Sequence, residues 1–349
     1  MAAGRPVVGM GPQLDLSVGN GAERDDQQSR LFDALIRYLG PEVSRAFADD
    51  DVTEVYLNPQ DGAVRVDTRS KGKVATGEHL PPHRVEMFLN AVAATIGTTI
   101  TRDQPRLQAE LPSGLFRGSR LQGFVPPVTH GPSFTIRKPP AVVYSLEDYV
   151  AAGTLSEDHR EVLRDAVSSH WSILVVGGTN SGKTTLVNAI LREITGQFPQ
   201  ERVVILEDTV ELQCSAPDYL ALRTGPDVSL AELVRSTLRT SPDRIVVGEV
   251  RGPEALELLD AWATGHPGGV ATVHASTPEG ALLRLDRLAQ RANVPSQKAL
   301  IAEAVDLITV IEGGNRGRRV SDLVRVNGLD SDGHFILNRF SGSTPCRAT

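Results

Sequence analysis

The chain has 349 residues and a formal net charge of −7, and 40% of its residues are hydrophobic and 23% charged. This length is enough for two globular domains, and the composition excludes a fibrous chain and one that is disordered throughout. Because the charge is acidic and no basic block stands out, the composition gives no support to a broad electrostatic contact with nucleic acid or acidic lipid.

The cysteines and the hydropathy pattern indicate the cellular compartment. Cys214 and Cys346 lack the paired spacing of a disulfide framework or a zinc knuckle, so we expect a reducing compartment and no zinc. No apolar run approaches the roughly 20 residues that span a bilayer, and the first residues carry no signal-peptide pattern. We therefore expect a cytoplasmic protein that associates with a membrane only peripherally.

The first part of the chain predicts a disordered tail, a small α/β domain and a linker. Residues 1–28 are rich in Gly and Asp without periodicity, so we expect no fixed structure there. Residues 29–138 form the predicted N-terminal α/β domain, and residues 139–156 have the prolines and mixed composition typical of a linker. The expected elements of the domain are helical turns over 31–47, strands over 52–58 and 62–68, and a helix over 84–97.

Residues 157–349 predict a doubly wound α/β domain. Five short, nearly continuous apolar runs alternate with amphipathic helices, as expected of parallel strands that are covered on both faces. These runs are SILVVGG, RVVILED, RIVVGEV, GGVATVHA and DLITVIE. Ser229 and Glu232 have the spacing of a capping box at the start of one helix. The last segments, RVSDLVRVNGL and GHFILNRF, are expected to form an antiparallel hairpin at the sheet edge, joined through DSDG.

A glycine-rich loop follows the first of these runs and precedes a helical pattern. Its spacing, Gly177-x4-Gly182-Lys183-Thr184, arises by accident in about one chain in a hundred of this length. In such a P-loop, backbone N–H groups surround phosphates, the lysine reaches the outer phosphates and the threonine hydroxyl holds Mg²⁺. Asn180 stands where many such loops have another glycine, and asparagine tolerates positive φ. The residues expected to bind nucleotide are Gly177, Gly178, Thr179, Asn180, Ser181, Gly182, Lys183, Thr184 and Thr185.

Acidic residues stand at the ends of two other apolar runs. Glu249 closes one run, and Glu207, Asp208 and Glu211 follow another. Because the carboxyl ends of parallel strands share one sheet edge, we expect these carboxylates to lie near the phosphates. Glu249 is assigned to water activation, and the predicted Mg²⁺ shell consists of Thr184, Asp208 and Glu249, partly through water. Any one of these carboxylates could instead be a helix cap or a surface charge.

The stretch TGHPGGVATVHAST contains two histidines, His266 and His274. Zinc would need further Cys or His ligands, which the chain does not place nearby. His274 ends a predicted parallel strand, so we expect its ring at the phosphate edge, where it could hydrogen-bond the γ-phosphate or a carboxylate. His266 precedes Pro-Gly-Gly in a tight loop and could simply brace that loop.

Four blocks, in this order, resemble the secretion-superfamily ATPases, which drive type II and type IV secretion, type IV pili and conjugation. The blocks are GGTNSGKTT, ILEDTVEL, LRTSPDRIVVGEVRGPEA and TGHPGGVATVHA. The resemblance implies that they are the Walker A loop, the Asp box, an atypical Walker B segment and the His box of a RecA-like P-loop ATPase domain. It also implies ATP and Mg²⁺ as ligands and makes Glu207, Glu249 and His274 the catalytic residues. EDTVELQC and IAEAVDLITVIE are most similar to the TrbB-type conjugal transfer ATPases, which are relatives of the VirB-type ATPases.

The same resemblance implies a homo-hexamer that works with inner-membrane components of a conjugation or secretion apparatus. In relatives the N-terminal domain lends arginines to the nucleotide. The candidates here, in LFRGSRLQGF and SFTIRKPP, are Arg117, Arg120 and Arg137, and the motif positions favour Arg120 and Arg137. These arginines could instead be solvated residues of an exposed hairpin. The resemblance places the protein at the inner face of the cytoplasmic membrane.

The sequence therefore predicts a hexameric ATPase that couples Mg-ATP hydrolysis to domain motion for conjugal transfer, type IV secretion or pilus assembly. One alternative is a secretion ATPase of the Tad or type IV pilus type, and another is a nucleic-acid-stimulated motor of the RecA or helicase type. The acidic charge and the lack of basic, aromatic-rich stretches argue against direct nucleic-acid binding. A nucleotide-gated scaffold with negligible turnover is disfavoured by Glu207 and Glu249, and a kinase by the lack of an acceptor-binding block.

Overall fold

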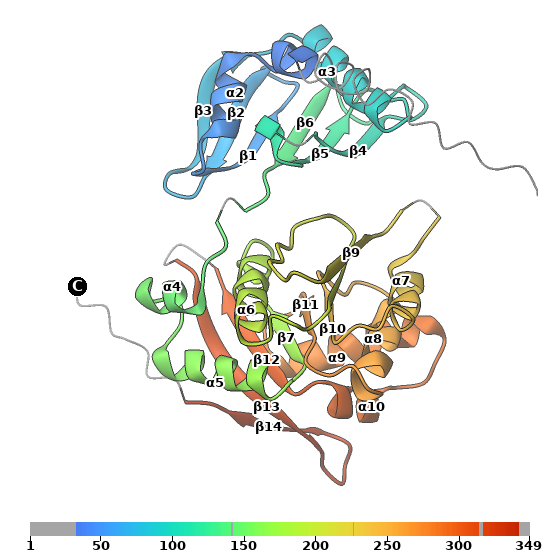
Figure 1. Ribbon diagram of the computed structural model, residues 1–349. Coiled ribbons are helices and arrows are strands. Elements are labelled where there is room, and N and C mark those ends of the chain that lie inside the picture. The colour runs from blue at the N-terminus through green and yellow to red at the C-terminus, as the bar shows by residue number, and fades with distance from the viewer. Residues whose placement is uncertain (1–32, 113, 141, 226, 314–316, 342–349) are drawn as a thin grey trace, which may run out of the picture. The chain divides into compact units, whose positions relative to one another are not determined.

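The structure is a computed structural model that describes residues 33–112, 114–140, 142–225, 227–313 and 317–341. The expected disordered tail and Cys346 lie outside these described residues. The chain forms two compact units, and the boundary in the sequence falls between Lys138 and Pro139 (Figure 1). We call them unit 1 and unit 2.

Unit 1 is an antiparallel sheet with helices packed on one face. Its strand order is β3-β2-β1-β6-β5-β4, and the alternating apolar residues of the strands face the helices. The strands are β1 (Val52–Leu57), β2 (Ala63–Thr68), β3 (Gly72–His79), β4 (Arg106–Glu110), β5 (Arg120–Phe124) and β6 (Ser133–Arg137). The helices are α2 (Pro41–Ala48), α3 (Pro82–Thr95) and the short η1 (Gly114–Phe116), and residues 33–39 are also helical. The small α/β domain expected from the sequence is confirmed.

The last residue of unit 1 is tied firmly to its sheet and to α2. The backbone N–H of Lys138 donates to Thr53 O (2.9 Å). Its ammonium group donates to the carbonyls of Ala46 (3.1 Å) and Asp49 (2.5 Å) at the end of α2. A lysine there satisfies carbonyls that the helix leaves without a partner. Burial lowers the pKa of Lys138 to about 8.

Unit 2 contains an eight-stranded mixed sheet in the order β14-β13-β12-β7-β11-β10-β8-β9. The strands from β12 to β9 in this order run parallel to one another, whereas β13 and β14 add an antiparallel hairpin at one edge. The parallel strands are β7 (Ile173–Val176), β8 (Val203–Glu207), β9 (Tyr219–Arg223), β10 (Arg244–Val247), β11 (Val270–Val273) and β12 (Leu307–Glu312). The hairpin consists of β13 (Arg319–Leu329) and β14 (Phe335–Arg339), as expected.

Helices cover both faces of this sheet, as the near-continuous apolar strands require. One apolar core lies under α4 (Leu146–Ala151), α5 (Glu157–Ser168) and α6 (Lys183–Gln197). The other lies under α7 (Leu230–Thr237), α8 (Glu254–Ala263), α9 (Pro278–Ala289) and α10 (Lys298–Ala304). Ser229 and Glu232 form the expected capping box at α7. The doubly wound architecture is confirmed, and none of the described helices is long and apolar enough to cross a membrane.

The segment expected to be a linker, residues 139–156, is partly helical and packs into unit 2. It contains α4, which begins with a capping box formed by Ser145 and Asp148. Leu146, Tyr149 and Leu155 are buried in the core of unit 2. The apolar spacing of α4 is too short to stand out in the sequence beside two prolines, so the helix is not expected there.

A buried ionic cluster joins the amino ends of the parallel strands. Arg244, the first residue of β10, is fully buried and pairs with Glu201 (2.6 Å). Its guanidinium also donates to the carbonyls of Gly268 (3.1 Å) and Val167 (3.2 Å), and Glu201 accepts from His170 (2.6 Å). A buried arginine is tolerated here because its charge is paired and its donors are used.

Candidate nucleotide site

The strand order brings the expected residues to one edge of the sheet. β7, which leads into the glycine-rich loop, pairs with β11, β11 pairs with β10, and β10 pairs with β8, all in parallel. His274 follows β11, Glu249 follows β10, and Glu207 ends β8. These side chains therefore start from neighbouring strand ends in the order loop, histidine, glutamate, glutamate.

The glycine-rich loop makes a tight turn into α6. Gly182 has φ 102° and caps α6, and Asn180 has φ 58°, the left-handed conformation that asparagine tolerates. A Cβ atom on Gly177 would lie 2.3 Å from the carbonyl oxygen of Ile311 in β12, so only glycine fits between these strands. Ser181 Oγ is buried and has no hydrogen-bond partner among the described residues. The loop thus presents an unused hydroxyl beside the helix N-terminus.

Lys183 lies within the curve of this loop. Its Nζ atom donates to the carbonyls of Gly177 (3.0 Å) and Gly178 (2.8 Å) and lies 3.4 Å from His274 Nε2. His274 Nε2 is in turn 3.5 Å from Glu249 Oε1. Burial and the charge of Lys183 lower the pKa of His274, so its ring is neutral at neutral pH. A neutral ring can accept from Lys183 or donate to Glu249 through the same nitrogen, depending on its tautomer.

Glu249 is ionised at neutral pH in spite of its partial burial. Burial alone would raise its pKa, but a hydrogen bond from Arg251 (2.6 Å) and the positive charges of Arg251 and Lys183 bring the pKa below its ordinary value. Arg251 also lies 3.7 Å from Asp208. Arg251 therefore bridges the carboxylates of two strand ends.

Glu207 has a different environment from Glu249. It is only 5% exposed, and burial raises its pKa to about 7 although the backbone N–H groups of Glu211 and Leu212 donate to its Oε1 atom, both at 2.9 Å. The carboxyl group of Glu207 thus closes the loop over residues 207–213, which we call the acidic segment. Its oxygen is used to hold that loop rather than to face the glycine-rich loop.

The acidic segment supplies a carboxylate that contacts Thr184. Thr184 Oγ1 donates to Glu211 Oε2 at 3.1 Å. Asp208, which the sequence predicts in the metal shell, accepts from Thr224 (3.1 Å) and lies 3.7 Å from Arg251. The turn that Glu207 closes directs the side chain of Glu211 toward Thr184. The position of these residues after a strand does not by itself predict such a turn.

The two histidines of the TGHPGGVATVHAST stretch have separate roles. His266 Nδ1 lies 2.9 Å from the carbonyl oxygen of Pro242, so its ring links the loop before β11 to the loop before β10. This is the bracing contact considered above. His274 alone reaches the sheet edge that carries Lys183 and Glu249.

The arginines expected to assist the nucleotide lie in unit 1. Arg120 of β5 is directly opposite Arg137 of β6, and Arg137 is also opposite Glu54 of β1. Arg117 pairs with Asp50 at 2.7 Å. Two like charges directly opposite each other disfavour the sheet. Arg120 and Arg137 form no ion pair with a carboxylate in the described part of the chain.

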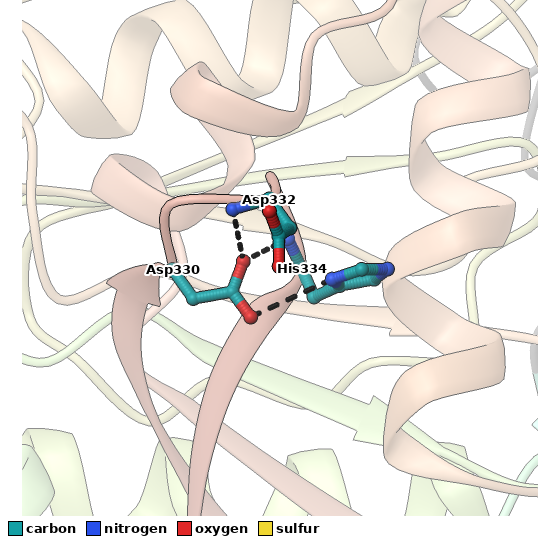
Figure 2. A group of neighbouring side chains, drawn as sticks. All are labelled: Asp330, Asp332 and His334. Atoms are coloured by element: carbon teal, nitrogen blue, oxygen red, sulfur yellow. Dashed lines mark hydrogen bonds and ion pairs between the residues drawn. The ribbon is translucent and has the colours of Figure 1, made fainter.

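One further acidic cluster lies in the turn between β13 and β14. Figure 2 shows Asp330 facing Asp332 and His334, all of them exposed. Asp330 Oδ1 accepts from the backbone N–H groups of Asp332 (2.9 Å) and His334 (2.8 Å), which is how an aspartate stabilises a tight turn. These contacts account for the arrangement as a hairpin turn.

A comparison with protein families decides the relationship of the chain. The family described as type II/IV secretion system protein matches residues 33–313. The chain belongs to this family. The resemblance inferred from the four blocks is confirmed, and the match spans both units of this secretion-family protein.

Individual relatives point to the same branch of the family. The chain is 44% identical to a probable conjugal transfer protein TrbB of Sinorhizobium fredii over 297 residues, which is 85% of this chain and 90% of the relative. It is 42% identical to the conjugal transfer protein TrbB of Rhizobium radiobacter, covering 89% of this chain and 95% of the relative. The type IV secretion system protein PtlH of Bordetella pertussis is 32% identical, with 89% of this chain and 99% of PtlH covered.

Two solved structures of ATPase and pilus-motor proteins share the fold. The ATPase DotB of Legionella pneumophila has a TM-score of 0.56 and 19% identity, with 85% of this chain and 78% of DotB covered. The pilus retraction motor PilT with bound ADP has a TM-score of 0.55 and 19% identity, with 85% of this chain and 81% of PilT covered.

Proposed function

We propose that the protein is a hexameric ATPase that hydrolyses Mg-ATP at the glycine-rich loop and converts hydrolysis into domain motion for conjugal transfer or type IV secretion. The observation that carries this proposal is the line Lys183–His274–Glu249 at one sheet edge, with separations of 3.4 and 3.5 Å. A phosphate-binding lysine and an ionised carboxylate are groups that hydrolysis of a phosphoanhydride uses, and a neutral imidazole between them can donate a hydrogen bond.

The residues of the loop fit the phosphates of a nucleoside triphosphate. Gly177 leaves no room for a side chain, the helix N-terminus at Gly182 favours an anion, and the buried hydroxyl of Ser181 is free to donate. Lys183 now donates to two loop carbonyls and can exchange them for phosphate oxygens. We infer that residues 177–185 bind the phosphates.

A magnesium ion bound with the nucleotide would neutralise charge on the outer phosphates. Thr184 and Glu211 lie 3.1 Å apart and are the residues best placed to hold it, with Glu249 contributing through water. Asp208 would act at longer range, because it is held by Thr224 and Arg251.

Glu249 is the proposed acceptor of the proton from the attacking water. Its lowered pKa keeps it ionised, and His274 on one side and Arg251 on the other fix its two oxygens. His274 is proposed to donate to Glu249 or to the outer phosphate. Glu207 is proposed to support catalysis by holding the acidic segment closed.

Arg120 and Arg137 are proposed to bind the nucleotide of a neighbouring subunit in the ring. Their direct opposition in the sheet would present two guanidinium groups to one phosphate chain, which supports this role. We further propose that the hexamer lies at the inner face of the cytoplasmic membrane and contacts inner-membrane components of the conjugation or secretion apparatus.

The test is the ATPase rate per subunit measured against protein concentration, for the wild type and for Glu249→Gln, with the mass determined on the same samples. We expect activity to rise as a six-subunit species forms, and the variant to bind Mg-ATP while its turnover falls about 10²–10⁴-fold. Full activity of a monomer would refute the role of Arg120 and Arg137. Near-normal turnover of Glu249→Gln would refute its role as proton acceptor.

A further inference from the structure

One face of α6 carries a row of polar side chains with contacts to two other segments. Thr184, Asn188 and Arg192 are spaced four residues apart and therefore lie along one side of the helix, over about 12 Å. Thr184 contacts Glu211 at the end that follows the glycine-rich loop. At the other end, Arg192 Nη1 donates to the carbonyl oxygen of Val143 (3.1 Å), in the chain that precedes α4.

Asn188, in the middle of this row, clamps the acidic segment. It is 1% exposed, its Oδ1 atom accepts from the backbone N–H of Gln213 (2.9 Å), and its Nδ2 atom donates to the carbonyl of Glu211 (3.4 Å). Glu207 holds the same segment from the other side through Glu211 and Leu212. A displacement of Glu211 must therefore change the position of Gln213 or break the contacts of a buried amide, which is costly.

Gln213 connects the acidic segment to the start of unit 2. Its Nε2 atom donates to the carbonyl oxygen of Pro140 at 2.6 Å. Proline has no N–H group, so this carbonyl is the only hydrogen-bonding group on the backbone of Pro140. Two residues earlier, Lys138 is fixed within unit 1. The connecting chain is thus held at Lys138 on the side of unit 1 and at Pro140 on the side of unit 2. Gln213 is the residue that holds Pro140.

We propose that Gln213 is a positioning residue that transmits the state of the nucleotide site to the chain between the two units. The inference rests on the proposed function, because it takes the ligand at Thr184 and Glu211 to be Mg-nucleotide. Engagement of Thr184 and Glu211 by the ligand replaces their mutual hydrogen bond and moves Glu211. Asn188 passes the movement to Gln213, and Gln213 passes it to Pro140.

The experiment is hydrogen exchange of the backbone amides of residues 142–150 in the full chain, with and without the magnesium complex of adenylyl imidodiphosphate. In the wild type we expect nucleotide to change the exchange rates of these amides about fivefold, which is the effect of one hydrogen bond gained or lost. Gln213→Ala and Gln213→Glu should lose this change, since neither side chain can donate to Pro140. Nucleotide affinity, titrated on the same samples, should stay within about threefold of the wild type.

Gln197→Ala is the matched control. Gln197 is the last residue of α6, and its side-chain amide donates to the carbonyl of Arg164 (3.3 Å) and to Glu193 (2.7 Å). Neither partner belongs to the acidic segment. It should keep the full nucleotide response. If the wild type does not bind nucleotide, the proposed function fails and the inference fails with it.

The remaining outcomes concern the inference alone. If the wild type binds nucleotide without a change at residues 142–150, or if both Gln213 variants keep that change, the transmission role is wrong while the proposed function stands. If both variants lose nucleotide binding, Gln213 belongs to the pocket and transmission is again refuted.

Discussion

Replacing Glu207 by glutamine should change how the stability of unit 2 depends on pH. Burial raises the pKa of Glu207 from its ordinary value of 4.5 to about 7, and with 5% exposure the carboxyl group has little screening by water. The folded protein therefore holds this proton over a pH range in which the unfolded chain has lost it, and stability falls as pH rises through that range. At 1.36 kcal/mol per pKa unit, the loss amounts to about 3 kcal/mol.

Glu207→Gln keeps an oxygen for the two backbone N–H groups but cannot ionise. We expect its free energy of unfolding, relative to the wild type, to rise by about 3 kcal/mol from about pH 4.5 to about pH 8.5. Both tryptophans, Trp171 and Trp262, lie in unit 2, so the fluorescence of a urea titration reports this unit. The control is Glu232→Gln, an exposed carboxylate whose pKa is lowered and not raised, by its hydrogen bonds to Ser229, so its replacement should give no such rise. A difference for Glu207→Gln that stays flat within about 1 kcal/mol would refute the burial argument.

Three further changes test other parts of the structure. Lys183→Ala should weaken binding of a fluorescent ATP analogue and abolish turnover, because the group that reaches the outer phosphates is gone; unchanged turnover would contradict the loop assignment. Arg251→Ala should raise the pKa of Glu249 and move the acid limb of the ATPase pH profile to higher pH, and a limb that stays in place would show that Arg251 does not hold this carboxylate ionised. Arg244→Ala should lower the free energy of unfolding of unit 2 by at least about 3 kcal/mol in the same tryptophan assay, since it leaves Glu201 without its buried partner; a loss under about 1 kcal/mol would mean that water replaces the pair.

Periodicity and strand-end position were enough to predict the main architecture and the proximity of three side chains at one sheet edge. Near-continuous apolar runs predict parallel strands, and residues that follow such strands share an edge. That reasoning brings Lys183, His274 and Glu249 together, and their separations in the structure agree with it.

Periodicity and strand-end position do not predict the contacts of the acidic segment. The choice between Asp208 and Glu211 beside Thr184 depends on a turn closed by a buried carboxyl group, and a turn of that kind has no periodicity. Arg251 and Gln213 act through side-chain hydrogen bonds to segments distant in the sequence, which a single sequence does not encode in any local pattern. The signal that could have found Arg251 is its place two residues after Glu249, where its guanidinium can turn back on the carboxylate.

The two ends of the parallel strands in unit 2 differ in what a mutation can do there. At the amino ends, Arg244 joins four segments through buried contacts, so substitutions there cost stability before they touch chemistry. At the carboxyl ends, the side chains of Glu249, Arg251 and His274 are partly exposed and can exchange partners without opening the core. We therefore expect the loops at the carboxyl ends of the strands to rearrange while the amino ends stay fixed. A change at the carboxyl ends would then tilt these loops and would not cause local unfolding.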